Sequence, residues 1–154
     1  MKAIRYIAVA LLLMAILAAC GGESSATEDV DLSGDWQGVL THELVDGGCP
    51  PTPPQQGTVR IQQVGSDMTL QFGEGFMCEP AEACAFTGSV RGMSFTASNG
   101  GSADQSGGVY ATTMDLSISP GGDSAMGTGT STYTHPELQC EWNTSLSLTR
   151  QAAD

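Results

Sequence analysis

The sequence predicts an all-β protein folded as an eight-stranded, up-and-down antiparallel β-barrel, with a β-sandwich as the alternative. Apolar and polar residues alternate with the period of two that is typical of half-buried strands. Charged residues make up only 14% of the 154-residue chain and 20 residues are Gly, a composition that suits strands and turns better than amphipathic helices. Short and long connections also alternate along the chain, which favours the barrel over the sandwich.

Eight segments show this alternation, and each presents one apolar face. In the first of them, Trp36, Leu40 and Leu44 share one face, and the other face carries Gln37, Val39, Thr41 and Glu43. Because an apolar face must be buried against its own sheet or a second one, the architectures to consider are a barrel and a sandwich. The expected strands span residues 35–44, 58–64, 67–72, 83–90, 93–98, 109–119, 124–133 and 140–149.

The connections distinguish the two architectures. Short turns follow the second, fourth and sixth expected strands, and every other link is longer. In an up-and-down meander every second connection lies at the same end, so all long loops would gather at one end. This asymmetry is typical of small ligand-binding barrels. The expected long links span residues 45–57, 73–82, 99–108 and 134–139.

The N-terminal segment 1–19 is expected to be a signal peptide. Lys2 and Arg5 precede the uncharged apolar run 7–19, which is too short for a transmembrane helix and fits the apolar core of a signal peptide. The sequence Leu-Ala-Ala-Cys at residues 17–20 resembles the lipobox of bacterial lipoproteins. That resemblance implies cleavage before Cys20 and attachment of lipid to it, and a plain secretory signal is the alternative.

The resemblance to bacterial lipoproteins also predicts the location of the protein. Gly21 follows the cysteine, where Asp would be the usual inner-membrane retention signal. In a Gram-negative host this favours a protein anchored to the outer membrane, facing the periplasm or the cell surface. Residues 20–31 are expected to form the lipidated cysteine and a flexible tether, and residues 32–150 the barrel domain.

The charge of the expected mature chain excludes some partners. Its only basic residues are Arg60, Arg91 and Arg150 against 17 acidic residues, a net charge of −14. Nucleic acid is therefore not an expected partner, because phosphate binding requires clustered Lys and Arg. The negative charge serves either solubility or attraction to a basic protein.

One motif resembles a known family. Gly34-Asp35-Trp36 begins the first expected strand and resembles the Gly-x-Trp signature of lipocalins and the wider calycin group. In that family the Trp closes one end of the barrel, and an Arg just after the last strand stacks on it. The resemblance implies that Trp36 and Arg150 close the barrel here. The alternative is an ordinary core aromatic and a solvated terminal charge, and the chain departs from the family in having no evident helix after its last strand.

Four cysteines besides Cys20 imply two disulfides in an exported domain, with three pairings open. All four fall at the expected long-loop end. A closed barrel places the last strand beside the first and brings Cys140 close to the chain just after Leu44. This favours the pairs Cys49–Cys140 and Cys78–Cys84.

Four further residues at the long-loop end form a candidate binding rim: His42, Phe76, Met77 and His135. Phe76 and Met77 lie in an acidic loop, and the alternative for Phe76 is that it folds inward onto the core. Two His and two Cys could bind zinc, but these cysteines lack close spacing and disulfides would consume their thiols. No metal site is therefore predicted.

The chain contains no recognisable catalytic motif, so no enzyme, catalytic residue or cofactor is predicted. The expected function is binding of a small apolar ligand or a partner at the long-loop end, and Gly38, Gly88 and Ala97 on the inward faces of the strands would leave space inside the barrel. The alternative is that aromatic side chains fill the interior. The lipoprotein would then bind or inhibit a basic protein through its acidic surface, or serve as a structural envelope lipoprotein with no discrete ligand.

Overall fold

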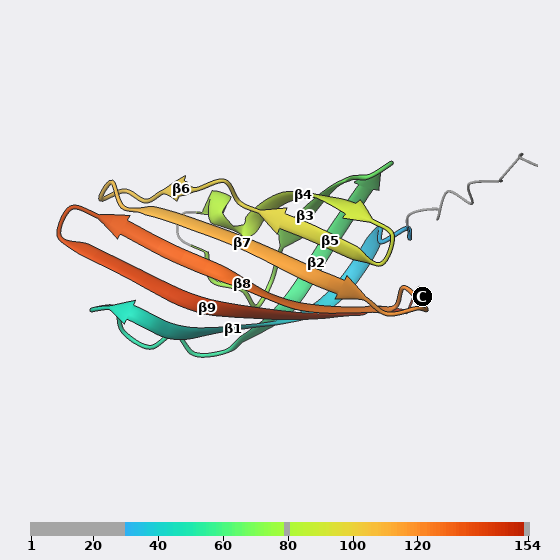
Figure 1. Cartoon of the computed structure of the whole chain (residues 1–154), viewed down its shortest axis with the longest axis horizontal. Helices are drawn as coiled ribbons and strands as arrows, with labels where there is room; N and C mark the ends of the chain where they lie inside the picture. The colour runs from blue at the N-terminus through green and yellow to red at the C-terminus, as the bar shows by residue number, and fades with distance from the viewer. Residues whose placement is uncertain (1–29, 79–80, 153–154) are drawn as a thin grey trace, which may run out of the picture.

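The computed structural model describes residues 30–78 and 81–152, and these form a closed, eight-stranded antiparallel barrel with one short additional strand (Figure 1). The expected signal peptide and Cys20 lie outside the described residues. A short 3₁₀ helix, η2 (Ala81–Cys84), precedes the fourth strand. The strands are β1 (Gly34–Gly47), β2 (Gln55–Val64), β3 (Asp67–Phe72), β4 (Ala85–Arg91), β5 (Ser94–Ser98), β6 (Ser102–Ala103), β7 (Val109–Ile118), β8 (Ser124–His135) and β9 (Leu138–Arg150).

The strands form one meander that closes on itself. Each long strand pairs antiparallel with the next, in the order β5-β4-β3-β2-β1-β9-β8-β7, and β5 pairs with β7 to complete the circle. The first and last strands pair from Trp36↔Arg150 to Gly47↔Cys140. This closure confirms the barrel and excludes the sandwich. The two-residue strand β6, which the sequence pattern did not predict, pairs with the beginning of β7.

The two ends of the barrel differ, as the alternation of connections predicts. At one end, called the closed end here, the turns after β2, β4 and β7 are short. Gly65 and Gly92 occupy two of these turns with φ near 60°, a left-handed conformation that glycine adopts readily. The opposite end, called the mouth, carries the longer links between β1 and β2, between β3 and β4, and between β5 and β7.

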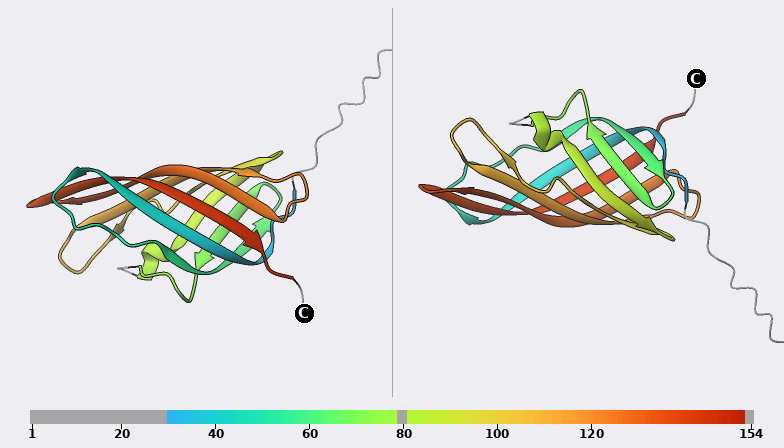
Figure 2. Two further views of the ribbon diagram at one scale, coloured as in Figure 1. Left: turned by 90° about the horizontal axis from the view of Figure 1, so that it is seen from below. Right: turned by 90° about the horizontal axis from the view of Figure 1, so that it is seen from above.

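One expected long link is wrong. Residues 134–139 do not form a loop, because β8 and β9 continue to the pair His135↔Leu138 and leave only Pro136 and Glu137 in the turn. The β-branched residues Thr132 and Thr134 suit a continuing strand better than a loop. The resulting β8–β9 hairpin reaches far out at the mouth end of the barrel (Figures 1 and 2).

The half of the barrel next to the closed end is filled by side chains. Its core includes Leu32, Trp36, Leu70, Leu116 and Leu148, each at most 1% exposed. Val30, the first described residue, also packs against this core. The described residues contain no helix with the length and apolar character needed to cross a membrane.

Trp36 and Arg150 lie together at this end of the barrel. Trp36 is fully buried, and its Nε1 donates a hydrogen bond to the Leu32 carbonyl at 2.9 Å. The guanidinium carbon of Arg150 lies 4.6 Å from the centre of the Trp36 ring. Arg150 also donates hydrogen bonds to three carbonyl oxygens, those of Ser33, Asp31 and Gly122, and so ties the incoming chain to the end of the last strand.

Candidate functional site

The half of the barrel next to the mouth encloses a cavity of about 290 Å³. Apolar and aromatic side chains make up most of its wall, with a smaller set of polar ones. The apolar part consists of Leu40, Phe72, Phe76, Met77, Cys78, Ala83, Phe86, Tyr110 and Trp142, and the polar part of His42, Thr52, Gln55, Asn99, Thr112 and Ser131.

Phe76 folds inward and forms the floor of this cavity. Its ring packs edge-on against Phe72, with centroids 4.7 Å apart, and also against the apolar core below. Gly38 makes room for it, because a Cβ at that position would lie 3.1 Å from Cζ of Phe76. The space expected at Gly38 is thus occupied by a side chain of this protein. Met77, by contrast, remains 74% exposed at the rim of the cavity.

The space expected at Gly88 and Ala97 does not exist as a cavity either. A Cβ on Gly88 would lie only 2.9 Å from Cα of Ala97 on the paired strand, so this glycine allows close approach of backbones. Ala97 is fully buried in the core. The inward positions expected to leave space are therefore filled or closed by the neighbouring chain, and the empty space lies among other residues next to the mouth.

Four polar side chains form a continuous hydrogen-bonded row, called the polar wall here, and three of them, His42, Ser131 and Thr112, line the cavity. His42 Nδ1 lies 2.9 Å from Thr144 Oγ1, which lies 2.7 Å from Ser131 Oγ, which in turn lies 2.8 Å from Thr112 Oγ1. The four residues come from β1, β9, β8 and β7, which are neighbours in the sheet. Thr144 and Ser131 are buried, at 1% and 5% exposure. Since each hydroxyl can donate one hydrogen bond and accept others, this row can present either a hydrogen-bond donor or an acceptor to a ligand.

His42 is uncharged at neutral pH in this environment. Burial lowers the pKa of its imidazole below the ordinary value of 6.5, because desolvation disfavours the charged form. The ring also packs edge-on near Trp142, with centroids 6.5 Å apart. The polar wall therefore supplies hydrogen bonds without supplying a positive charge.

Trp142 carries a buried hydrogen-bond donor that is not used. Its side chain lines the cavity and is 6% exposed, and its Nε1 has no hydrogen-bond partner among the described residues. A buried donor without an acceptor costs about 1–3 kcal/mol.

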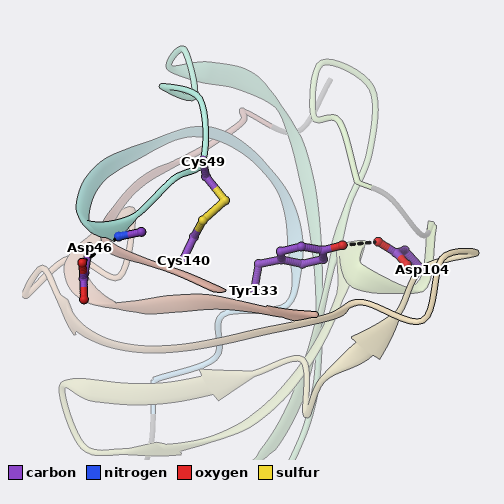
Figure 3. Close-up of a disulfide and its surroundings, with 6 residues drawn as sticks. Asp46, Cys49, Asp104, Tyr133 and Cys140 are labelled. Atoms are coloured by element: carbon purple, nitrogen blue, oxygen red, sulfur yellow. Dashed lines mark hydrogen bonds between the residues drawn. A yellow bond between two sulfur atoms is a disulfide. The ribbon is translucent and has the colours of Figure 1, made fainter. Parts of the chain in front are cut away.

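Two disulfides fix the segments around the mouth, and both have the favoured pairing. Cys49–Cys140 joins the link after β1 to the β8–β9 hairpin (Figure 3). Cys78–Cys84 spans the segment that follows Phe76 and ends with η2. Because the cavity floor is a loop residue, the second bridge restrains the loop that positions it.

A hydrogen bond also holds the link between β6 and β7 against β8. The hydroxyl of Tyr133 donates a hydrogen bond of 3.0 Å to Asp104 Oδ2 (Figure 3). The other oxygen of Asp104 accepts hydrogen bonds from the Ser106 hydroxyl and from the amides of Ser106 and Gly108. These bonds, the one from the Ser106 hydroxyl foremost, lower the pKa of Asp104 below its ordinary value.

Only three of the four residues of the candidate binding rim lie together at the cavity. His42, Phe76 and Met77 line the cavity, whereas His135 is absent from its wall. His135 lies near the tip of the β8–β9 hairpin, where its ring stacks on Tyr133 and its Nδ1 accepts the amide hydrogen of Glu137. In residues 30–78 and 81–152 no group of three or more His, Cys, Asp or Glu side chains is placed to hold a metal ion.

The polar wall is the part of the site that sequence reasoning missed. Thr112 and Thr144 occupy inward positions of strands that are otherwise apolar on that face, and Ser131 lies inward on the Gly-rich strand β8. Hydroxyls on the apolar face of neighbouring strands were the available signal.

No protein-family model, curated protein or solved structure matches this chain.

Proposed function

We propose that this chain is an outer-membrane lipoprotein, anchored through lipid on Cys20, whose barrel binds one small, mostly apolar molecule at its mouth. The observation that carries the proposal is the cavity of about 290 Å³, walled by aromatic side chains and a few convergent polar groups. Ligand sites in proteins typically have this composition, and this volume lies at the small end of their range. The filled half of the barrel below Phe76 gives the site a solid floor.

The polar groups indicate what the ligand carries besides its apolar body. The row from His42 to Thr112 offers hydroxyls on one wall. A ligand with a hydrogen-bonding oxygen would pair with these hydroxyls, and a polar site of this kind discriminates against analogues that lack the matching group.

The position at which the chain enters the barrel indicates which end would lie nearer the proposed lipid anchor. Val30 contacts the closed end, since a Cβ on Gly122 would lie 2.8 Å from its Cγ1. The described chain therefore enters the barrel at the end opposite the mouth. A lipid-anchored barrel would then hold its mouth away from the membrane and exchange ligand with the aqueous phase. The packing of Arg150 on Trp36 supports the proposed kinship with lipocalins.

Native mass spectrometry of residues 22–154, exported to a periplasm without lipid and purified gently, tests the proposal. All strands lie beyond residue 30, so this form lacks none of them. The expected result is a mass excess of one small molecule, lost on denaturation. Phe76→Trp, which enlarges the floor residue into the cavity, is expected to reduce that excess. A bare mass from a protein that also takes up no apolar probe would contradict the proposal and favour a protein partner.

A further inference from the structure

The basic residues of the barrel all lie away from the mouth. Among the described residues there are three Arg and no Lys. Arg60 pairs with Asp35 near the beginning of β1, Arg91 ends β4 at a short turn, and Arg150 caps Trp36. All three therefore belong to the half of the barrel next to the closed end.

The acidic residues are concentrated in the other half. Of the twelve described Asp and Glu residues, five lie toward the closed end, where the three Arg offset most of their charge. The other seven surround the mouth with no Arg or Lys among them. The seven residues, called the acidic rim here, are Glu43, Asp46, Glu74, Glu82, Asp104, Glu137 and Glu141.

Three members of the acidic rim are direct chain neighbours of residues that line the cavity. Glu43 follows His42, Glu82 precedes Ala83, and Glu141 precedes Trp142. All three are exposed, so they act on a ligand through their field rather than by contact. Charges of one sign around an opening with walls of low dielectric concentrate that field and raise the local concentration of the opposite charge.

The cavity itself suits a cation with an apolar body. The faces of aromatic rings attract cations, and the wall contains the rings of Trp142, Tyr110 and Phe86. It contains no Arg or Lys that could neutralise a carboxylate or a phosphate. His42 does not replace them, because burial lowers its pKa.

From the charge distribution and the aromatic wall together, we propose that the cavity selects small organic cations, namely protonated amines with an apolar aromatic-sized body, and rejects anions of the same shape. This inference rests on the proposed ligand-binding function and narrows its ligand class. The rim attracts the ammonium group, the aromatic wall holds the apolar body, and the polar wall binds any oxygen the ligand carries.

Three probes with the same apolar body and different charges distinguish selection by charge from selection by shape. Each is a methoxynaphthalene, carrying an aminomethyl, a hydroxymethyl or a carboxylate group, and binding is measured by calorimetry on residues 22–154 at neutral pH. In low salt the ammonium probe is expected to bind about tenfold more tightly than the carboxylate, with the alcohol between them. At about 0.5 M salt the ratio is expected to fall several-fold, because the rim is screened.

Two triple variants remove the same charge at opposite ends. Glu43→Gln, Glu82→Gln and Glu141→Gln together neutralise the rim positions beside the cavity, and Asp67→Asn, Asp115→Asn and Asp123→Asn form the matched control. All six side chains are exposed. The rim variant is expected to lose most of the preference for the ammonium probe and to keep its affinity for the alcohol. The control variant is expected to retain the preference.

The outcomes separate this inference from the proposed function. Equal affinity for the three probes, or tighter binding of the carboxylate, would overturn charge selection while the cavity remained a binding site. Equal loss of preference in both triple variants would overturn the role of the acidic rim. Failure of all three probes to bind would overturn the proposed function together with this inference.

Discussion

The ring of Phe76 fits against the bare backbone of Gly38, with its Cζ 3.1 Å from the place that a Cβ on Gly38 would occupy. A residue from the long link after β3 thus reaches the inside of β1, and it does so because β1 carries no side chain there. This contact divides the barrel into a filled half and a hollow half. The depth of the proposed binding site depends on it.

Shortening Phe76 should deepen the cavity. Phe76→Ala removes the floor ring, so we expect tighter binding of probes longer than a bicyclic body, together with a loss of about 2–3 kcal/mol in the free energy of unfolding. Calorimetry and urea unfolding measure the two effects. Met77→Ala in the same loop is the control, since Met77 is 74% exposed and should change stability little. Unchanged affinity for long probes in Phe76→Ala would show that Phe76 is not the floor.

The two disulfides should differ in their contribution to stability. Cys49–Cys140 closes a loop with a sequence separation of 91 residues, and Cys78–Cys84 one with a separation of 6. In the chain-entropy model, replacing both cysteines by Ser costs about 4–5 kcal/mol for the long bridge and about 2–2.5 kcal/mol for the short one. Urea unfolding of the two double variants measures the difference. A larger loss from the short bridge would mean that its restraint of the Phe76 loop outweighs chain entropy.

Arg150 should stabilise the barrel far more than Arg60, although both are paired. Arg150 stacks on Trp36 and donates to three carbonyls, so Arg150→Ala is expected to cost about 2–4 kcal/mol. Arg60 pairs with Asp35 in solvent, with side chains 64% and 53% exposed, so Arg60→Ala should change stability little. The free energy of unfolding in urea tests both. Equal effects of the two substitutions would contradict the closing role of Arg150.

Stability should fall on mild acidification because of His42. Burial lowers its pKa in the folded state, so the unfolded chain takes up a proton first as the pH falls through 6.5. Above that value the residue is neutral in both states and carries no cost. Urea unfolding at neutral pH and at about pH 5.5 should show a larger loss for the natural chain than for His42→Gln. A loss of the same size in both chains would mean that His42 does not cause it.

Much of the architecture could be predicted from the alternation of apolar and polar residues and from the lengths of the loops. Both are local signals in the sequence, and closure of the barrel then determines which strands pair. The pairing Cys49–Cys140 followed from closure alone, since β9 must lie beside β1. The β8–β9 hairpin was missed because Pro136 and the surrounding polar residues also suit a loop. The direction of Phe76 was left open, since it depends on Gly38, which is distant in the sequence.

The central claim is that the half next to the mouth takes up a ligand and the other half does not, and the two Trp side chains report on the two halves separately. Trp142 lines the cavity with an unpartnered N–H, and the N–H of Trp36 is bonded to Leu32 in the core. We would titrate ¹⁵N-labelled residues 22–154 with hydroxymethyl methoxynaphthalene and follow both indole N–H resonances. If only the half next to the mouth binds the probe, the Trp142 resonance moves to saturation while that of Trp36 stays in place. No movement of the Trp142 resonance at saturating probe, or movement of the Trp36 resonance alone, would contradict it.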